Sequence, residues 1–99
     1  MDAPAEIRVS ADKKVLKLHW LAGLQELSAH LLRIESPSAE VKGHFGQGGV
    51  KPVGKENVTI SALEGVGNYA LKITFSDGHR TGLYTWEYLY NLGRELPHA

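Results

Sequence analysis

The chain has 99 residues, and its eleven basic side chains balance eleven acidic ones, so it carries no formal net charge at pH 7. This length predicts a single domain, and the charge balance gives no reason to expect binding to nucleic acid or to an anionic membrane. The absence of cysteine excludes disulfides, thiolate catalysis and the usual zinc sites, and it fits a reducing compartment. Because neither a signal peptide nor a stretch near the ~20 apolar residues of a membrane span is visible, we expect a cytoplasmic protein.

The first third of the chain has the patterns of strands. After a flexible tail over residues 1–4, charged and apolar residues alternate over 6–9, which predicts a short edge strand. Over 15–20 the even positions are apolar and can face a core, and Gly23 offers a hairpin turn into a return strand over 24–27.

Two short helical segments are expected next. Ser28 can cap a segment over 29–33, because its side chain can accept from backbone N–H groups two or three residues further on. Ser36 is the candidate N-cap of a second helical turn, which Gly43 would end. A glycine-rich loop over 43–57 is expected to follow.

The second half repeats this order of elements. A strand is expected over 57–60, a connection over 62–68 and a half-buried strand over 69–75, whose apolar and polar side chains alternate. The pair Asp77-Gly78 is typical of a type I′ hairpin turn, in which both central residues have positive φ. Thr85 then takes the place of Ser28 as the cap of a helix.

The segments VLKLHWLAG at 15–23 and ALKITFSDG at 70–78 are alike, since each is an alternating strand that ends in a glycine turn. One ββα unit cannot bury its sheet face alone, so two packed copies make a sensible core. We therefore expect an α+β fold, an antiparallel hairpin-rich sheet with short helices, built from two similar ββα units. It would form one domain over 1–99, with flexible tails at 1–4 and 94–99.

The candidate site residues lie around the Asp-Gly turn. Asp77 and His79 can form a small polar site with His44 from the glycine-rich loop. The competing interpretation is that a histidine after such a turn is an ordinary exposed polar residue. No Ser-His-Asp, nucleophile-elbow or paired-carboxylate pattern indicates an enzyme.

Aromatic residues follow the turn. Trp86 and Leu89 share one helical face and are expected in the core. Core packing is expected for most of the remaining aromatic residues. Any of three tyrosines can instead stay partly exposed, where tyrosine suits an interface because it buries apolar area while keeping a hydroxyl wet: Tyr84, Tyr88 or Tyr90.

Four segments carry a resemblance to known proteins: Glu6-Ile7, LLRIESPSAEVKGH at 31–44, NVTI at 57–60 and FSDGHRTGLYTWEYLYNLG at 75–93. They resemble DUF971, a family of small bacterial proteins of unknown function. That family is similar to the N-terminal domain of gamma-butyrobetaine hydroxylase and trimethyllysine hydroxylase. The same module is found appended to a P-loop scaffold protein of iron–sulfur cluster assembly in chloroplasts.

In those hydroxylases the domain resembles a small zinc module with a Cys-Pro-Cys-x-x-Cys run and one later histidine. The resemblance places the three cysteines on Ser36, Ser38 and Val41 of this chain and the histidine on His79. Neutral serine and valine side chains cannot replace thiolates, so neither the tetrahedral zinc site of that module nor a cofactor is expected. The iron-binding His-x-Asp…His triad of the oxygenase domain is absent as well, which argues against that activity.

The sequence leaves two functions open. The first is a non-catalytic binding module for an unknown protein partner, associated through its family with iron–sulfur assembly or with a metabolic enzyme. Its contact surface would combine the Asp77–His79 turn, the 43–57 loop and exposed tyrosines. The second is a metal- or small-ligand-binding domain that uses His79 with His44. In either case we expect a monomer.

Overall fold

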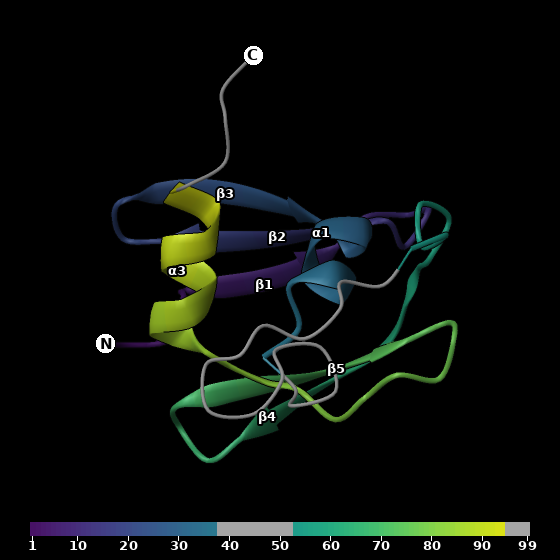
Figure 1. Cartoon of the computed structure of the whole chain (residues 1–99). Helices are drawn as coiled ribbons and strands as arrows, with labels where there is room; N and C mark the ends of the chain where they lie inside the picture. Colours follow the sequence, from purple (N-terminus) through teal and green to yellow (C-terminus); the bar gives the residue numbers. More distant parts are fainter. Residues whose placement is uncertain (38–52, 95–99) are drawn as a thin grey trace.

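The computed structural model describes residues 1–37 and 53–94. In these ranges the elements are β1 (Glu6–Val9), β2 (Val15–Trp20), β3 (Gly23–Ser28), α1 (Ala29–Ile34), β4 (Ile60–Val66), β5 (Ala70–Phe75), β6 (Leu83–Thr85) and α3 (Trp86–Arg94). Figure 1 shows the strands as two groups, with α1 and α3 lying on one face of the first group. The predicted end of a second helical turn at Gly43 and most of the 43–57 loop lie outside the described residues.

The first sheet contains three antiparallel strands in the order β1-β2-β3. The predicted alternation of β2 is confirmed, because the side chains at positions 16, 18 and 20 are buried. Trp20 pairs with Gly23 and Leu16 with Leu27, so β2 and β3 form the predicted hairpin. β1 pairs with β2 alone and therefore lies at the edge, as predicted.

The first helix follows this hairpin directly. Ser28 caps α1 as predicted, since its Oγ accepts from the backbone N–H of Leu31 at 3.0 Å. Ala29 and Leu32 are fully buried, so one face of this short helix packs against the core. The helix ends at Ile34, one residue beyond the predicted range.

The second sheet has the order β4-β5-β6 and corrects two predictions. β4 occupies 60–66, so it begins at the last residue of the predicted 57–60 strand and takes in most of the predicted 62–68 connection. Pairing with β5 forms this strand although its own side chains are mostly exposed and hardly alternate. Residues 57–59 are not part of it. Tyr69 was expected to face the core but precedes β5 and is 51% exposed, whereas the next apolar positions of β5 are buried.

The last helix completes the second unit. Thr85 caps α3 as predicted, since its Oγ1 accepts from the backbone N–H of Tyr88 at 3.1 Å. Trp86 and Leu89 are buried, also as predicted. The helix extends to Arg94, the first residue of the predicted tail.

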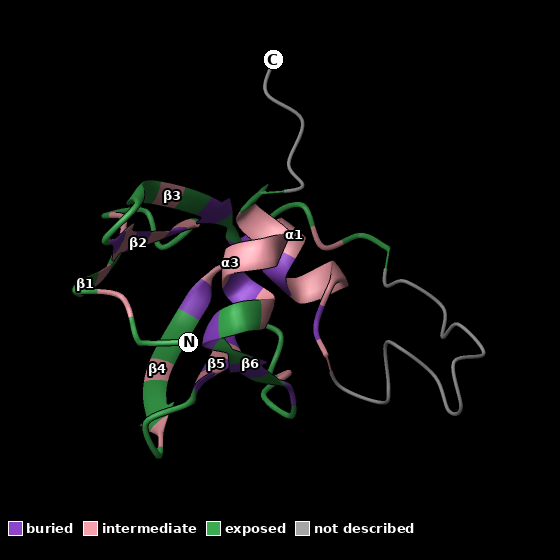
Figure 2. Ribbon diagram, turned by 90° about the vertical axis from the view of Figure 1, so that its left-hand side faces the viewer, coloured by how far each residue is buried: buried purple, intermediate pink, exposed green. Residues whose placement is uncertain are grey.

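The α+β fold with two ββα units, β2-β3-α1 and β5-β6-α3, is confirmed. Its strands form two three-stranded sheets rather than one. The sheets meet where the backbone N–H of Ile60 donates to the carbonyl of Lys13 at 2.8 Å. Figure 2 shows the buried residues gathered where helices and strands meet, so both units share a single core. Within the described ranges, no helix has the length and apolar character needed to cross a membrane.

Candidate functional site

The turn after β5 contains three residues rather than two. The backbone N–H of Gly78 donates to the carbonyl of Phe75 at 2.9 Å, and the N–H of Phe75 donates to the carbonyl of His79 at 2.9 Å. Gly78 has φ 91°, whereas Lys13 is the sole described residue other than glycine with a positive φ. The predicted type I′ turn is therefore wrong, because Asp77 does not adopt the required φ and a single left-handed position is filled by glycine.

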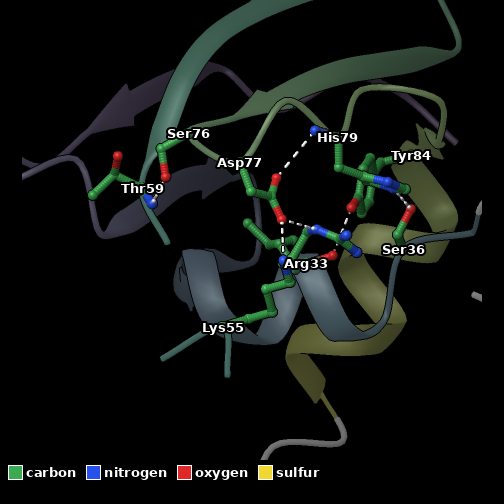
Figure 3. A network of polar contacts seen from close by, with 9 residues as sticks. Arg33, Ser36, Lys55, Thr59, Ser76, Asp77, His79 and Tyr84 are labelled. Atoms are coloured by element: carbon green, nitrogen blue, oxygen red, sulfur yellow. Dashed lines mark hydrogen bonds and ion pairs between the residues drawn. The ribbon is translucent and has the colours of Figure 1, made fainter. Parts of the chain in front are cut away.

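Asp77 is the centre of a polar network (Figure 3). Its Oδ2 accepts from Arg33 Nε at 2.8 Å and from Lys55 Nζ at 2.9 Å, while its Oδ1 accepts from the backbone N–H of His79 at 3.0 Å. The three side chains are mostly buried, with exposed fractions of 21% for Asp77, 11% for Arg33 and 28% for Lys55. The network thus joins α1, the segment before β4 and the turn after β5.

The pKa of Asp77 reflects these contacts. Partial burial raises this pKa, but the hydrogen bonds from Lys55, from the backbone and from Arg33 together outweigh the burial. The pKa therefore lies well below its ordinary value of 3.8, and Asp77 is ionised at neutral pH.

His79 lies against Ser36, with its Nε2 2.9 Å from the serine Oγ. Ser36 is fully buried, and its surroundings are tightly packed. A Cβ at Gly82 would lie 2.4 Å from Ser36 Oγ and 3.0 Å from Pro37 Cδ, so this position has room for glycine alone. The predicted proximity of Asp77 and His79 is observed, but both side chains are engaged within the fold.

This contact bears on the resemblance to a zinc module. The structure brings together two of the four ligand positions, Ser36 and His79, yet a hydroxyl and an imidazole joined by a hydrogen bond do not fit a tetrahedral zinc site. Among residues 1–37 and 53–94, no group of three histidine, cysteine or acidic side chains could hold a metal ion. Ser38, Val41 and His44 lie outside these ranges, so the pairing of His79 with His44 stays a prediction.

Tyr84 is fully buried, so its expected place on an exposed contact surface is wrong. It is the middle residue of β6, and the strand turns it inward while its two neighbours face solvent. Its hydroxyl donates to the carbonyl of Leu32 at 2.6 Å, and burial raises the pKa of that hydroxyl well above its ordinary value. The Tyr88 hydroxyl likewise donates to the carbonyl of Glu35. Both tyrosines therefore bind the end of α1.

A second candidate surface, at the β2–β3 hairpin, was not identified from the sequence. Leu21 is fully exposed and lines a hollow of about 200 Å³ together with Trp20 and Tyr90. The rings of Trp20 and Tyr90 pack edge to face with centroids 5.4 Å apart. We call Trp20, Leu21 and Tyr90 the hairpin surface. Leu24 is 53% exposed but pairs with His19, so it lies on the opposite face of the sheet. The available signal in the sequence was a leucine in the turn between two predicted strands.

Gln25 fixes the geometry of the hairpin surface. Its Oε1 accepts from Trp20 Nε1 at 2.8 Å, and its Nε2 donates to the backbone carbonyl of Tyr90 at 3.2 Å. Met1 lines this hollow and also a neighbouring one of about 210 Å³ that includes Tyr69 and Trp86. Since Met1 and Tyr69 are themselves 63% and 51% exposed, the apolar surface continues beyond the hairpin.

Comparisons with known proteins agree with the geometry of this fold. The family model described as gamma-butyrobetaine hydroxylase-like, N-terminal, matches residues 7–90. The chain is similar to the crystal structure of a DUF971 family protein of unknown function from Acidithiobacillus ferrooxidans, with 38% identity over 93% of each chain and a TM-score of 0.76.

Two solution NMR structures are similar as well. One is 44% identical, with 95% of this chain and 74% of the other covered and a TM-score of 0.79. The other is 39% identical, with 95% and 70% covered and a TM-score of 0.77. A search of the curated proteins gave no match.

Proposed function

Because the chain belongs to the gamma-butyrobetaine hydroxylase-like N-terminal family, DUF971, we propose that it acts as a non-catalytic module that binds a protein partner through the hairpin surface. The observation that carries this proposal is the exposure of Leu21 and Met1 at the hollow lined by Trp20 and Tyr90. Clustered exposed apolar side chains mark interaction sites, and tryptophan and tyrosine are enriched among the residues that dominate binding energy.

The polar network supports a structural role for Asp77 and His79. A nucleophile has to be reached by its substrate, but the Ser36 hydroxyl beside His79 is fully buried. An efficient general base has a pKa near the working pH, whereas the pKa of Asp77 is held far below it by two cations and a backbone N–H. These contacts favour a module that presents a surface over one that performs a reaction.

The hairpin surface replaces the Asp77–His79 turn as the proposed contact region. Gln25 links the indole of Trp20 to the backbone of Tyr90 before any partner arrives, and this ordering lowers the entropy lost on binding. Through its family resemblance, we propose proteins of iron–sulfur assembly and metabolic enzymes as the first partners to test. We propose that the module binds its partner in the cytoplasm as a monomer.

The test compares two matched substitutions. Leu21→Asp places a charge at the centre of the hairpin surface, while Val53→Asp places one at another exposed apolar residue, 87% exposed, outside that surface. We expect partner affinity to fall about tenfold or more for Leu21→Asp and to stay unchanged for Val53→Asp, with both variants melting like the wild type. Equal loss of binding in both variants would contradict the proposed surface.

A further inference from the structure

A polar hollow of about 270 Å³ lies beside the ion pairs of Asp77. We call it the Lys55 hollow, and its lining consists of Gly54, Lys55, Asn57, Val58, Ser76 and Asp77. We propose that the Lys55 hollow binds a carboxylate anion. This ligand site is separate from the hairpin surface and does not depend on the proposed partner.

The charges of the described side chains beside the Lys55 hollow do not cancel. Arg33 and Lys55 both contact the same oxygen of one carboxylate, Asp77 Oδ2, at 2.8 and 2.9 Å. Two cations and one carboxylate leave a net positive charge, which water screens only in part because the exposed fractions of these side chains are 11% to 28%. A monovalent carboxylate would restore neutrality, whereas a dianionic phosphate would leave excess negative charge next to Asp77.

Arg33 adds to the positive charge beside the Lys55 hollow. Its Nε donates to Asp77, but its Nη1 is buried and has no hydrogen-bond acceptor in the described part of the chain. A buried donor without an acceptor is rare in folded proteins and calls for a compensating interaction. Arg33 does not line the Lys55 hollow, so an anion there would attract its positive charge through space and would not supply the missing acceptor of Nη1.

The walls of the Lys55 hollow supply donors. The ammonium of Lys55 has three N–H groups, of which the contact with Asp77 uses one. The Oγ of Ser76 accepts from the backbone N–H of Thr59 at 3.0 Å, so its own hydrogen can be donated to a ligand. The amide of Asn57 is exposed at the rim. Together these groups can hydrogen-bond both oxygens of a carboxylate.

Size and surroundings agree with this ligand class. Pockets for drug-sized molecules span roughly 300–1,000 Å³, so about 270 Å³ suits a small acid or a single acidic side chain. Glu56 and Arg80 are exposed, line no part of the Lys55 hollow and carry opposite charges. Because their charges are opposite, they do not change the net charge of the described side chains around the Lys55 hollow.

The experiment is an NMR titration of the ¹⁵N-labelled full chain at pH 7 and constant ionic strength. Sodium acetate represents a free acid, the blocked amino acid N-acetyl-aspartate amide represents a partner's side chain, and sodium chloride is the control. We expect saturable shifts at the amides of Lys55, Asn57 and Ser76 with at least one carboxylate and none with chloride. Saturation by one probe alone identifies the source, and saturation by both shows that the site accepts either kind of carboxylate; linear shifts that match chloride would overturn the proposal.

Variants locate the site. Lys55→Gln should weaken carboxylate binding about tenfold or more, because a hydrogen bond to a charged group is that strong, while Lys55→Arg should retain binding. Asn57→Ala, at an exposed position, should weaken binding about threefold to tenfold without disturbing the ion pairs. Arg80→Gln is the matched control and should bind like the wild type. Unchanged affinity in both Lys55→Gln and Asn57→Ala would show that the Lys55 hollow is not the site.

Discussion

The buried hydroxyl of Tyr84 makes one of the hydrogen bonds that join the second ββα unit to the first. The last carbonyls of a helix have no partner within the helix, and in α1 the carbonyl of Leu32 receives the Tyr84 hydroxyl at 2.6 Å. Tyr84→Phe keeps the ring in the core and removes this donor. The substitution therefore removes the hydrogen bond to Leu32, together with the contact of the same hydroxyl with the Ser36 side chain, and leaves the apolar packing of the ring in place.

The expected loss follows from burial. Both partners of the bond are enclosed, so Tyr84→Phe leaves a buried carbonyl unsatisfied, which costs about 1–3 kcal/mol of unfolding free energy. For a domain of this size each kcal/mol lowers the melting temperature by roughly 4–8 °C. Urea titration followed by tryptophan fluorescence, with thermal unfolding followed by circular dichroism, measures both quantities.

Tyr69→Phe is the matched control. Tyr69 is 51% exposed, and its hydroxyl makes no hydrogen bond in the described part of the chain, so this variant should unfold within about 0.5 kcal/mol of the wild type. If Tyr84→Phe proves as stable as Tyr69→Phe, the assignment of Tyr84 as the partner of α1 is refuted.

Three further substitutions test the caps, the packing and the charges. Gly82→Ala should lower the unfolding free energy in urea by about 1–3 kcal/mol, because its Cβ would lie 2.4 Å from Ser36 Oγ, whereas Gly65→Ala meets no atom within 4 Å and should not. Thr85→Ala removes the cap acceptor of α3 and should lower it by about 1 kcal/mol, measured by thermal unfolding. The depressed pKa of Asp77 means that its ionised form stabilises the fold above pH 3.8 and that this contribution is lost as the pH falls below that value. The stability gap between the wild type and Asp77→Asn, measured in urea, should therefore be present at pH 7 and shrink in acid; a gap that does not change with pH would contradict the role of the ion pairs.

Part of the candidate site could be predicted because the Asp-Gly turn puts Asp77 and His79 near each other in the chain. The turn type could not, because the φ of Asp77 depends on how residues 75 and 79 pair rather than on the dipeptide. The partners of Asp77 were missed for another reason. Arg33 lies 44 positions away, and nothing in the local pattern of either residue marks the other as its partner.

The sequence by itself determined the elements that follow local rules. The alternation of β2 and the caps Ser28 and Thr85 depend on residues within one or two turns of chain, so both ββα units could be recognised from them. β4 was the exception, since an edge strand with exposed side chains is formed by pairing rather than by its own pattern.

Only the tertiary structure decided which faces the two units bury. Packing against α1 buries Tyr84, which was expected on an exposed surface. The contact of Gln25 with Tyr90, 65 positions away, helps to form the hairpin surface instead. A side chain's environment depends on elements that reach it from distant parts of the chain. A periodic pattern shows that a strand or helix has an inner and an outer face. The contacts across the core decide what packs against each face.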